Sequence, residues 1–238
     1  MLDLFSGAGG MGYGFKQAGF NIVLANDVFK EASLTYKRNN PGVNFVEGSI
    51  TEKEVKEKII AISEKNSIDI IIGGPPCQGF SLAGKRLSDD PRNFLYKEFV
   101  SLVDRLKPKV FVMENVTGIL SSNGGKTFES IKSEFSALGY SISAKKLLAS
   151  DYGVPQKRKR VFIVGTYNVE CIFNPKKIIL DEKDYISVDD AISDLYNIKA
   201  IENKENIIEY KPDKDLTEYQ KYLTNKITIE EFINSIKC

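Results

Sequence analysis

Short runs of β-branched and aliphatic residues alternate with longer segments that carry apolar residues at three- and four-residue spacing over the first two thirds of the chain. The runs predict strands and the longer segments predict helices. Strand, helix, strand repeated in this way implies right-handed crossovers and a Rossmann-like, doubly wound α/β fold with a mostly parallel sheet. The predicted strands are residues 2–5, 22–25, 44–46, 68–72, 109–113 and 161–164, and the predicted helices lie near residues 11–18, 30–39, 52–65, 93–106 and 127–138.

The amino-acid composition of the chain changes after about residue 175. Residues 196–238 are rich in Lys, Glu, Asn and Ile and contain no glycine. The run from Ser187 to Asp190 predicts the cap of a short helix through Leu195, because an acidic group near a helix N-terminus is favourable. We therefore expect a first domain over residues 1–175 and an incomplete C-terminal extension over residues 176–238.

Composition and charge exclude several classes of protein. The 238-residue chain is 42% hydrophobic, enough for a core, and its net charge of +1 excludes a uniformly cationic surface but not a local basic patch. Histidine is absent, which excludes mechanisms that need an imidazole base, such as Ser-His-Asp hydrolysis. Cysteines stand at 77, 171 and 238, with neither paired nor metal-ligand spacing, so we expect no disulfide framework, no metal and a reducing interior.

Neither a membrane span nor a signal peptide is expected. No apolar run approaches the roughly 18 residues that a bilayer span needs. The chain opens MLDLFSGAGG, without a basic stretch that leads into an apolar one. The expectation is a cytoplasmic protein of prokaryotic type with no membrane partner.

A glycine-rich turn follows the first predicted strand, where ligands of such sheets bind. Residues 5–10 read Phe-Ser-Gly-Ala-Gly-Gly, and glycines let the backbone approach a ligand and expose amide N–H groups at a helix N-terminus. The spacing is not that of the dinucleotide motif, and no lysine follows to favour phosphate. Asp27, at the end of the second strand, can accept both hydroxyls of a ribose. These features predict a nucleoside-containing cofactor, with a tight structural turn as the alternative.

A cysteine loop follows the most apolar strand. Pro75 and Pro76 fix the backbone just before Cys77, so the thiol is held in one direction. A structural cysteine would normally sit inside an apolar run, and Cys77 does not. A reactive nucleophile is therefore favoured over a packing role.

Charged residues follow two further strands. Glu114 comes after residues 109–113 and shares a sheet edge with Cys77 if their strands are neighbours; an N-cap or a surface acid is the alternative. Arg158 and Arg160 precede the strand at 161–164, and strand alternation puts them on one face. They are either two guanidinium groups directed at a base or phosphate, or part of an exposed edge strand.

Four motifs together carry a resemblance. In order and rough spacing they resemble the successive motifs of the DNA (cytosine-5)-methyltransferases, over about residues 1–166 with a weaker echo through Asp194. The resemblance implies the class I fold of methyltransferases that depend on S-adenosylmethionine. The motifs are residues 5–10, Gly-Pro-Pro-Cys-Gln-Gly-Phe-Ser at 74–81, Met-Glu-Asn-Val at 113–116 and Asp-Tyr-Gly-Val-Pro-Gln-Lys-Arg-Lys-Arg at 151–160.

The resemblance implies methyl transfer from S-adenosylmethionine to C5 of a cytosine flipped out of double-stranded DNA. Cys77 would attack C6, Glu114 would hydrogen-bond or protonate N3, and Arg158 and Arg160 would hold the base. The cofactor-binding residues it implies are Phe5, Gly7, Gly9, Asp27, Val28, Ser49, Ile50, Pro75 and Leu95. The DNA-contacting residues it implies are Gln78, Ser81, Lys85 and Arg86.

The chain departs from the family pattern in two ways. Ser49 stands where the family often has an Asp that contacts the adenine amino group, which predicts weaker cofactor binding. After Asp194 no target-recognition region or final cofactor-pocket segment is recognisable. The chain therefore resembles the catalytic half of a split enzyme that needs a complementing subunit, with a truncated or decayed product as the alternative.

Two other functions compete with DNA methylation. The first is an RNA (tRNA) cytosine-5 methyltransferase, whose cysteine loop usually continues Pro-Cys-Gln-Pro-Phe-Thr. Here Gly79-Phe-Ser81 follows instead, which favours DNA. The second is a non-catalytic subunit that binds S-adenosylmethionine or DNA.

Overall fold

The computed structural model describes residues 1–76, 95–196, 198 and 215–236. It divides into two compact units: the first unit comprises Met1–Lys146 and Arg160–Asn174, and the second comprises Leu147–Lys159 and Pro175–Cys238. Residues 147–159, which the sequence analysis assigned to the first domain, thus belong to the second unit. The division at residues 174 and 175 lies next to the predicted boundary.

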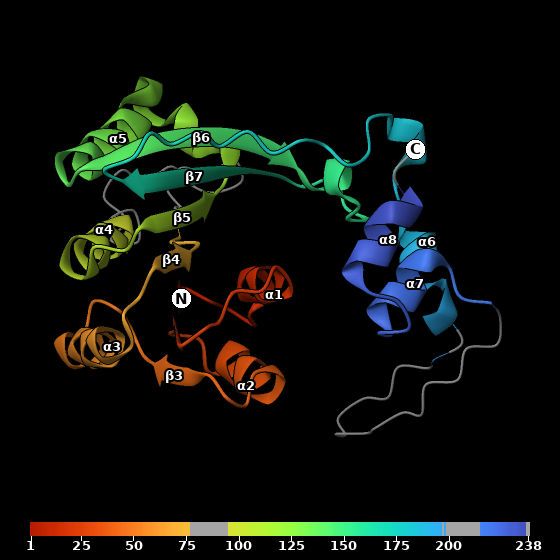
Figure 1. Ribbon diagram of the computed structural model, residues 1–238, viewed down its shortest axis with the longest axis horizontal. Coiled ribbons are helices and arrows are strands. Elements are labelled where there is room, and N and C mark those ends of the chain that lie inside the picture. Colours follow the sequence, from red (N-terminus) through yellow and green to blue (C-terminus); the bar gives the residue numbers. More distant parts are fainter. Residues whose placement is uncertain (77–94, 197, 199–214, 237–238) are drawn as a thin grey trace. The chain divides into compact units, whose positions relative to one another are not determined.

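The first unit is built on a sheet with the strand order β3-β2-β1-β4-β5-β7-β6. Strands β1 to β5 pair in parallel, and β7 pairs antiparallel to β5. Helices α1 and α2 cover one face and α3, α4 and α5 the other (Figure 1). The predicted doubly wound, mostly parallel α/β fold is confirmed. The strands are β1 Leu2–Leu4, β2 Leu24–Asp27, β3 Asn44–Glu47, β4 Ile70–Gly73, β5 Val110–Asn115, β6 Tyr140–Leu148 and β7 Lys159–Tyr167.

Each predicted helix of the first unit is present within one or two residues, because its apolar positions recur at helical spacing. Strand β6 was not predicted. Its residues are mostly half-buried or exposed, so they give no continuous apolar run. The helices are α1 Gly10–Gln17, α2 Lys30–Asn39, α3 Lys53–Asn66, α4 Leu95–Leu106 and α5 Lys126–Ala137, with 3-10 helices η3 Thr117–Leu120 and η4 Ser122–Gly125.

Hydrophobic clusters lie on both faces of the sheet. On one face Phe99, Phe111 and Phe135 are fully buried, and the Phe111 and Phe135 rings stack with centroids 4.0 Å apart. On the other face a smaller cluster centres on Ile72 and Val112. Strands buried on both faces explain why the runs of β4 and β5 are almost continuously apolar.

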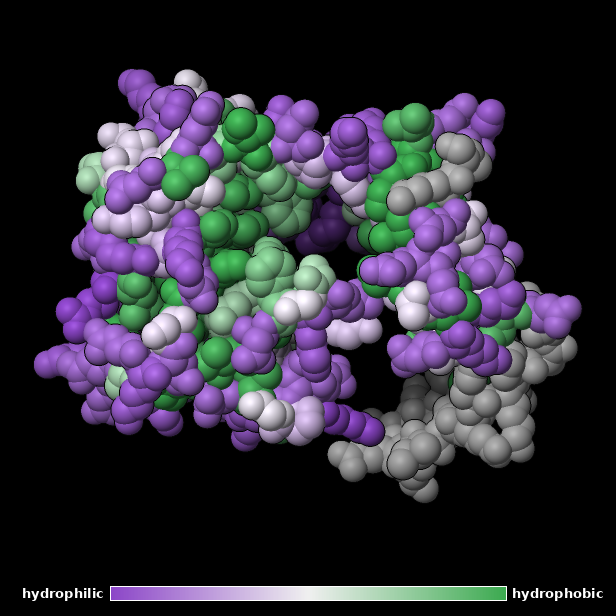
Figure 2. All heavy atoms as spheres, viewed as in Figure 1, coloured by the Kyte–Doolittle hydropathy of each residue, from purple (hydrophilic) through white to green (hydrophobic). Residues whose placement is uncertain are grey.

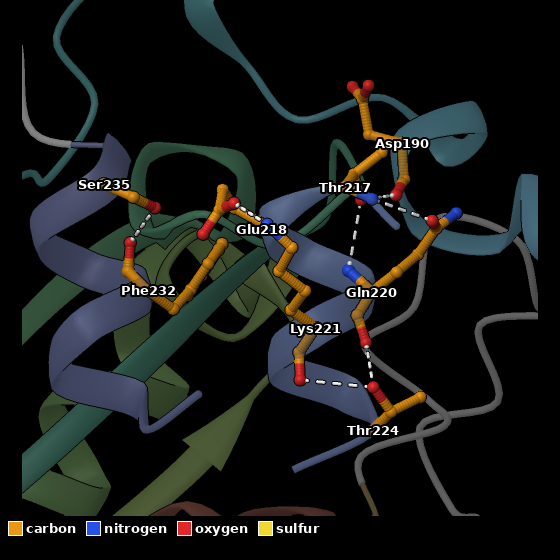
Figure 3. Close-up of polar contacts among 8 residues, drawn as sticks. All are labelled: Asp190, Thr217, Glu218, Gln220, Lys221, Thr224, Phe232 and Ser235. Carbon is orange, nitrogen blue, oxygen red and sulfur yellow. Dashed lines mark hydrogen bonds and ion pairs between the residues drawn. The ribbon is translucent and has the colours of Figure 1, made fainter. Parts of the chain in front are cut away.

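The second unit consists of short helices. As predicted, Ser187 caps α6 through a capping box with Asp190. Thr217 caps α7 in the same way with Gln220, and its hydroxyl donates to the Asp190 carbonyl oxygen at 2.6 Å (Figure 3). The elements are η5 Ala149–Tyr152, η6 Glu182–Asp184, α6 Val188–Ile192, η7 Ser193–Leu195, α7 Glu218–Leu223 and α8 Ile229–Ile236.

Hydrophilic side chains cover much of the face drawn in Figure 2, with apolar side chains in groups between them. None of the helices in the described residues has the length and apolar character to cross a membrane.

The carboxyl group of Asp3, in β1, is almost completely buried. Asp3 is 1% exposed, and among the described residues its Oδ1 has no hydrogen-bond partner. Burial raises the pKa of Asp3 to about 7; the Tyr36 hydroxyl, 3.5 Å from Oδ2, opposes this shift and the charge of Asp27 adds to it. The folded state is therefore more stable when the Asp3 carboxyl is protonated than when it is ionised.

Stability should accordingly depend on pH through Asp3. Because its folded-state pKa lies above the unfolded value of 3.8, its contribution is fully present below about pH 4 and is lost as pH rises through 7. Asp3→Asn removes this loss, so its unfolding free energy relative to wild type should rise by roughly 2 to 3 kcal/mol between pH 5 and pH 8. Urea unfolding of both proteins at the two pH values measures the change. A difference independent of pH would contradict the prediction.

Candidate functional site

A cavity of about 300 Å³ lies in the first unit where β1, β2, β3 and β4 end. These are the carboxyl ends of parallel strands, where backbone amides and side chains from separate loops converge. Most of the residues expected to bind a cofactor line it. The lining residues are Phe5, Gly7, Asn26, Asp27, Val28, Phe29, Gly48, Ser49, Ile50, Gly74, Pro76 and Leu95.

The glycine turn lines the cavity through Phe5 and Gly7. Phe5 and Gly7 have positive φ angles of 52° and 54°, and a Cβ added at Gly7 would meet no described atom within 4 Å. A ligand can therefore approach the backbone closely there. Gly9 serves the turn differently, because a Cβ at Gly9 would lie 2.9 Å from the buried Tyr36 ring of α2. Gly9 is outside the cavity lining.

Asp27 connects the turn to the second strand. Its Oδ2 accepts the Gly7 N–H at 2.7 Å and its Oδ1 accepts the Phe29 N–H at 2.8 Å. Each carboxylate oxygen has two lone pairs, so both can still accept a hydroxyl from a ligand. The predicted ribose acceptor is thus already oriented by the backbone that it holds.

Residues after β2, after β3 and at the start of α4 add to the lining. Val28, Ile50 and Leu95 supply apolar surface. Ser49 also lines the cavity, and its Oγ is 2.8 Å from the Thr51 hydroxyl. The predicted positions of all four residues therefore converge on one cavity.

Five lining residues were not predicted as cofactor-binding residues, and two of them contribute side chains of note: Asn26 and Phe29, besides Gly48, Gly74 and Pro76. Asn26 is buried, and its Nδ2 donates to the carbonyl oxygens of Val46 (2.8 Å) and Gly48 (3.1 Å), which fixes the loop carrying Ser49. Phe29 lines the cavity although 68% of its surface is exposed. A polar residue inside an apolar strand was the available signal for Asn26, whereas an exposed Phe after Asp27 has no local signature.

The loop after β4 separates the cavity from a charged pair. Gly74 and Pro76 line the cavity, whereas Pro75 is buried outside its lining and its carbonyl oxygen accepts from Asn115 Nδ2 at 3.0 Å. A Cβ added at Gly74 would lie 3.3 Å from Glu114 Oε2. The cavity and the Glu114 carboxylate therefore border the same stretch of backbone.

Glu114 and Arg160 form the charged pair. Arg160 Nε lies 2.9 Å from Glu114 Oε1, and the two side chains are 24% and 25% exposed. Glu114 is inside β5, not after it as the sequence predicted, because the antiparallel pairing with β7 extends the strand to Asn115. The neighbouring position of β4 and β5, on which the sequence argument depended, is confirmed.

Arg158 and Arg160 do not belong to the same element of the structure. Strand β7 begins at Lys159, so the strand alternation that was to put both arginines on one face does not extend to Arg158. Arg158 belongs to the second unit, and Arg160 belongs to the first. A base-holding role for Arg158 stays a prediction.

Several predicted site residues lie outside the described residues, and their roles stay predictions. These are the nucleophile Cys77 and the DNA-contacting residues Gln78, Ser81, Lys85 and Arg86. Across the described part of the chain, no group of three or more His, Cys, Asp or Glu residues could hold a metal ion.

The residues present fit a nucleoside cofactor. The cavity offers a backbone approach at Gly7, a buried carboxylate at Asp27 and apolar walls at Val28, Ile50 and Leu95. A ribose, which needs acceptors, and an adenine, which needs apolar faces, are served by these groups. S-adenosylmethionine contains both.

Comparisons with known proteins agree with this chemistry. The family model "C-5 cytosine-specific DNA methylase" matches residues 1–237. The chain is 45% identical over 214 residues to the Type II methyltransferase M.DdeI of Desulfomicrobium norvegicum, with 86% of this chain and 50% of that protein covered. It is 37% identical over 251 residues to the Type II methyltransferase M.AgeI of Thalassovita gelatinovora, with 95% and 58% covered.

A solved structure is similar as well. It is that of a prophage-encoded E. coli protein assigned as a DNA modification methyltransferase, with a TM-score of 0.73 and 32% identity over 92% of this chain and 62% of that one. The chain therefore spans between about half and three fifths of the length of these relatives.

Proposed function

Because the chain belongs to the family of C-5 cytosine-specific DNA methylases, we propose that it transfers a methyl group from S-adenosylmethionine to C5 of cytosine in double-stranded DNA. Members of this family use S-adenosylmethionine as methyl donor. The family match covers nearly the whole chain and does not favour the RNA alternative. One observation carries the proposal. Gly74 lines a cavity of the size of a nucleoside and also lies beside the Glu114 carboxylate, which is paired with Arg160.

The two halves of the site suit the two halves of the reaction. S-adenosylmethionine, when bound, supplies an electrophilic methyl group on a sulfonium. Asp27, oriented by the Gly7 N–H, would hold its ribose, and Val28 and Ile50 would flank its adenine. Pro76 lines the same cavity, and Cys77 is the next residue in the sequence, which supports its assignment to the same site.

Cytosine C5 is a poor nucleophile until C6 carries an electron-donating adduct. We assign Cys77 the addition to C6, which forms a C–S bond while the ring electrons move toward N3. Glu114 hydrogen-bonds or protonates N3, where charge develops only on attack. C5 then takes the methyl group, a base removes the C5 proton, and the thiolate leaves C6 to restore the aromatic ring.

Arg160 supports Glu114 in this scheme. Its Nε holds one carboxylate oxygen, and the other oxygen, Oε2, faces Gly74. The guanidinium balances the carboxylate charge at a partly buried position and limits its rotation. The target base must be flipped out of the duplex to reach this pair, at a cost of a few kcal/mol.

The test is methyl transfer from labelled S-adenosylmethionine to DNA of mixed sequence, followed by digestion to nucleosides. 5-Methyldeoxycytidine is the expected product. Because we also propose that a complementing subunit supplies DNA recognition, the assay is run with and without the product of the adjacent reading frame. Transfer only to tRNA would support the RNA alternative, and cofactor binding without transfer in either mixture would support a non-catalytic subunit.

The serine at position 49 gives a quantitative prediction. Ser49→Asp should bind S-adenosylmethionine roughly 3- to 10-fold more tightly than wild type, because a carboxylate accepts the adenine amino hydrogen more strongly than a hydroxyl does. Isothermal titration calorimetry measures the affinity. Ser49→Asn, which adds similar bulk without charge, is the control. Equal affinities of the Asp variant and the wild type would refute the prediction.

A further inference from the structure

In the second unit, residues 151–158, here called the basic loop, run from η5 to the start of β7 and carry Lys157 and Arg158. Asp151 lies in η5 and is 5% exposed. Its carboxylate accepts the Tyr185 hydroxyl through Oδ1 and pairs with Lys177 Nζ at 3.0 Å through Oδ2. Its backbone carbonyl accepts the N–H groups of Ile178 and Ile179 at 2.9 and 3.0 Å. Segment 177–185 thus clamps η5 through side chain and main chain together.

The same segment reaches the far end of the loop. Lys157 Nζ lies 3.1 Å from Glu182 Oε2 and 5.9 Å from the centroid of the Tyr185 ring. Both ends of that ion pair are largely exposed, so it stabilises little by itself. Tyr185 is therefore the residue that contacts both ends of the loop, with its hydroxyl on Asp151 and its ring beside Lys157.

Main-chain hydrogen bonds connect η5 to the backbone of Arg158. The Arg158 carbonyl oxygen accepts the Ala149 N–H at 2.9 Å, and the Arg158 N–H donates to the Gln156 carbonyl oxygen at 2.8 Å. Ala149 opens the same η5 turn that contains Asp151. A shift of η5 would therefore displace the backbone from which the exposed Arg158 side chain extends.

We propose that Tyr185 and Asp151 are positioning residues that set the place of Arg158 for its contact with DNA. The inference rests on the proposed function, because it takes Arg158 as a group that holds the target base or a neighbouring phosphate. Segment 177–185 lies outside the four short motifs at residues 5–10, 74–81, 113–116 and 151–160, although the family model spans it. Its role follows from the contacts with η5 alone.

The protonation states of Tyr185 and Lys177 favour their contacts with Asp151. The hydrogen bond to Asp151 raises the pKa of Tyr185, and the same carboxylate raises the pKa of Lys177. Both partners therefore keep their protons around neutral pH while Asp151 accepts. A hydrogen bond to a buried, charged acceptor is among the stronger kinds in proteins.

The experiment compares Tyr185→Phe with a matched control in the same unit. The control is Tyr196→Phe, which removes a hydroxyl that donates to Asp189 Oδ1 at 2.9 Å away from the basic loop. Hydrogen–deuterium exchange over residues 152–160, the affinity for S-adenosylmethionine, and kcat/KM for DNA are measured on each, with the complementing subunit where transfer needs it.

Tyr185→Phe should exchange faster over residues 152–160 and lose about 5- to 10-fold in kcat/KM for DNA. Its affinity for S-adenosylmethionine should equal that of wild type, because every lining residue of the cavity belongs to the first unit. Tyr196→Phe should match wild type in all three. Asp151→Asn, which keeps an acceptor for Tyr185 but loses the charge that holds Lys177, should show a smaller loss than an Arg158→Ala variant.

Two failures are distinguishable. Exchange and kcat/KM in Tyr185→Phe that equal those of Tyr196→Phe overturn the inference and leave the proposed function standing. No methyl transfer by the wild-type protein in either mixture overturns the proposed function, and with it the assigned purpose of the clamp. A loss of cofactor affinity in Tyr185→Phe would also overturn the inference, since a general structural defect would then explain the effect.

Discussion

Cys77→Ser is expected to reduce methyl transfer by about four orders of magnitude or more. A serine hydroxyl is a far weaker nucleophile than a thiolate at neutral pH and needs a neighbouring base. The chain contains no histidine to supply an imidazole. Affinity for S-adenosylmethionine should be unchanged, because the residues that line the cavity are all retained.

The measurement pairs labelled methyl transfer with covalent trapping. On DNA that contains 5-fluorocytosine, fluorine replaces the hydrogen that must leave C5, so the adduct between Cys77 and C6 persists through a denaturing gel. Wild type should form the adduct and Cys77→Ser should not. Cys171→Ser is the matched control, since the Cys171 thiol contacts the Val164 carbonyl oxygen at 3.4 Å in the same unit and should be dispensable. Trapping by Cys77→Ser would rule out Cys77 as the nucleophile.

Glu114→Gln is expected to lower kcat by roughly 10²- to 10³-fold. The amide is nearly the same size and can still hydrogen-bond to the base, but it cannot carry a proton to N3. The substitution also leaves Arg160 without the carboxylate that lies 2.9 Å from its Nε. Cofactor affinity should change little, because Glu114 does not line the cavity.

Single-turnover methyl transfer and cofactor titration separate these two effects. Glu64→Gln is the control: it breaks another carboxylate–arginine pair of the first unit, with Arg105 at 2.6 Å, at a more exposed position. Exposed pairs are worth about 1 kcal/mol or less, so this variant should keep wild-type activity. A Glu114→Gln enzyme with undiminished kcat would remove Glu114 from the proposed mechanism.

Local patterns in the sequence predicted most of the first unit. The apolar runs that became β1, β2, β4 and β5 are mostly buried, so they carry a strong apolar signal, whereas the edge strand β3 is largely exposed. The helices between them show a helical period, and Ser187 with Asp190 forms the expected capping box. Strand β6 and helix α7 went unpredicted, because half-exposed strands and very short helices have weak periodicity.

The candidate site was predicted in the same uneven way. The glycine turn with Phe5 and Gly7, the strand end at Asp27, and Ser49, which the family resemblance singled out, all line one cavity, and their roles in binding stay predictions. The contact between Glu114 and Arg160 depended on the register of β5 against β7, which no local pattern specifies. Gly9 and Pro75 were expected at the cavity, but Gly9 packs on Tyr36 and Pro75 accepts from Asn115 instead.

The sequence by itself determined the alternation of strands and helices from β1 to α5, the edge of the sheet where the chemistry lies, and the family to which that chemistry belongs. These depend on periodicity and on short motifs, which a chain carries locally. Only the tertiary structure decided that Asp27 holds the glycine turn, that Asn26 holds the loop after β3, and that segment 177–185 clamps η5. Such contacts join residues 20 or more positions apart, so they exist only once packing has brought distant segments within hydrogen-bond distance.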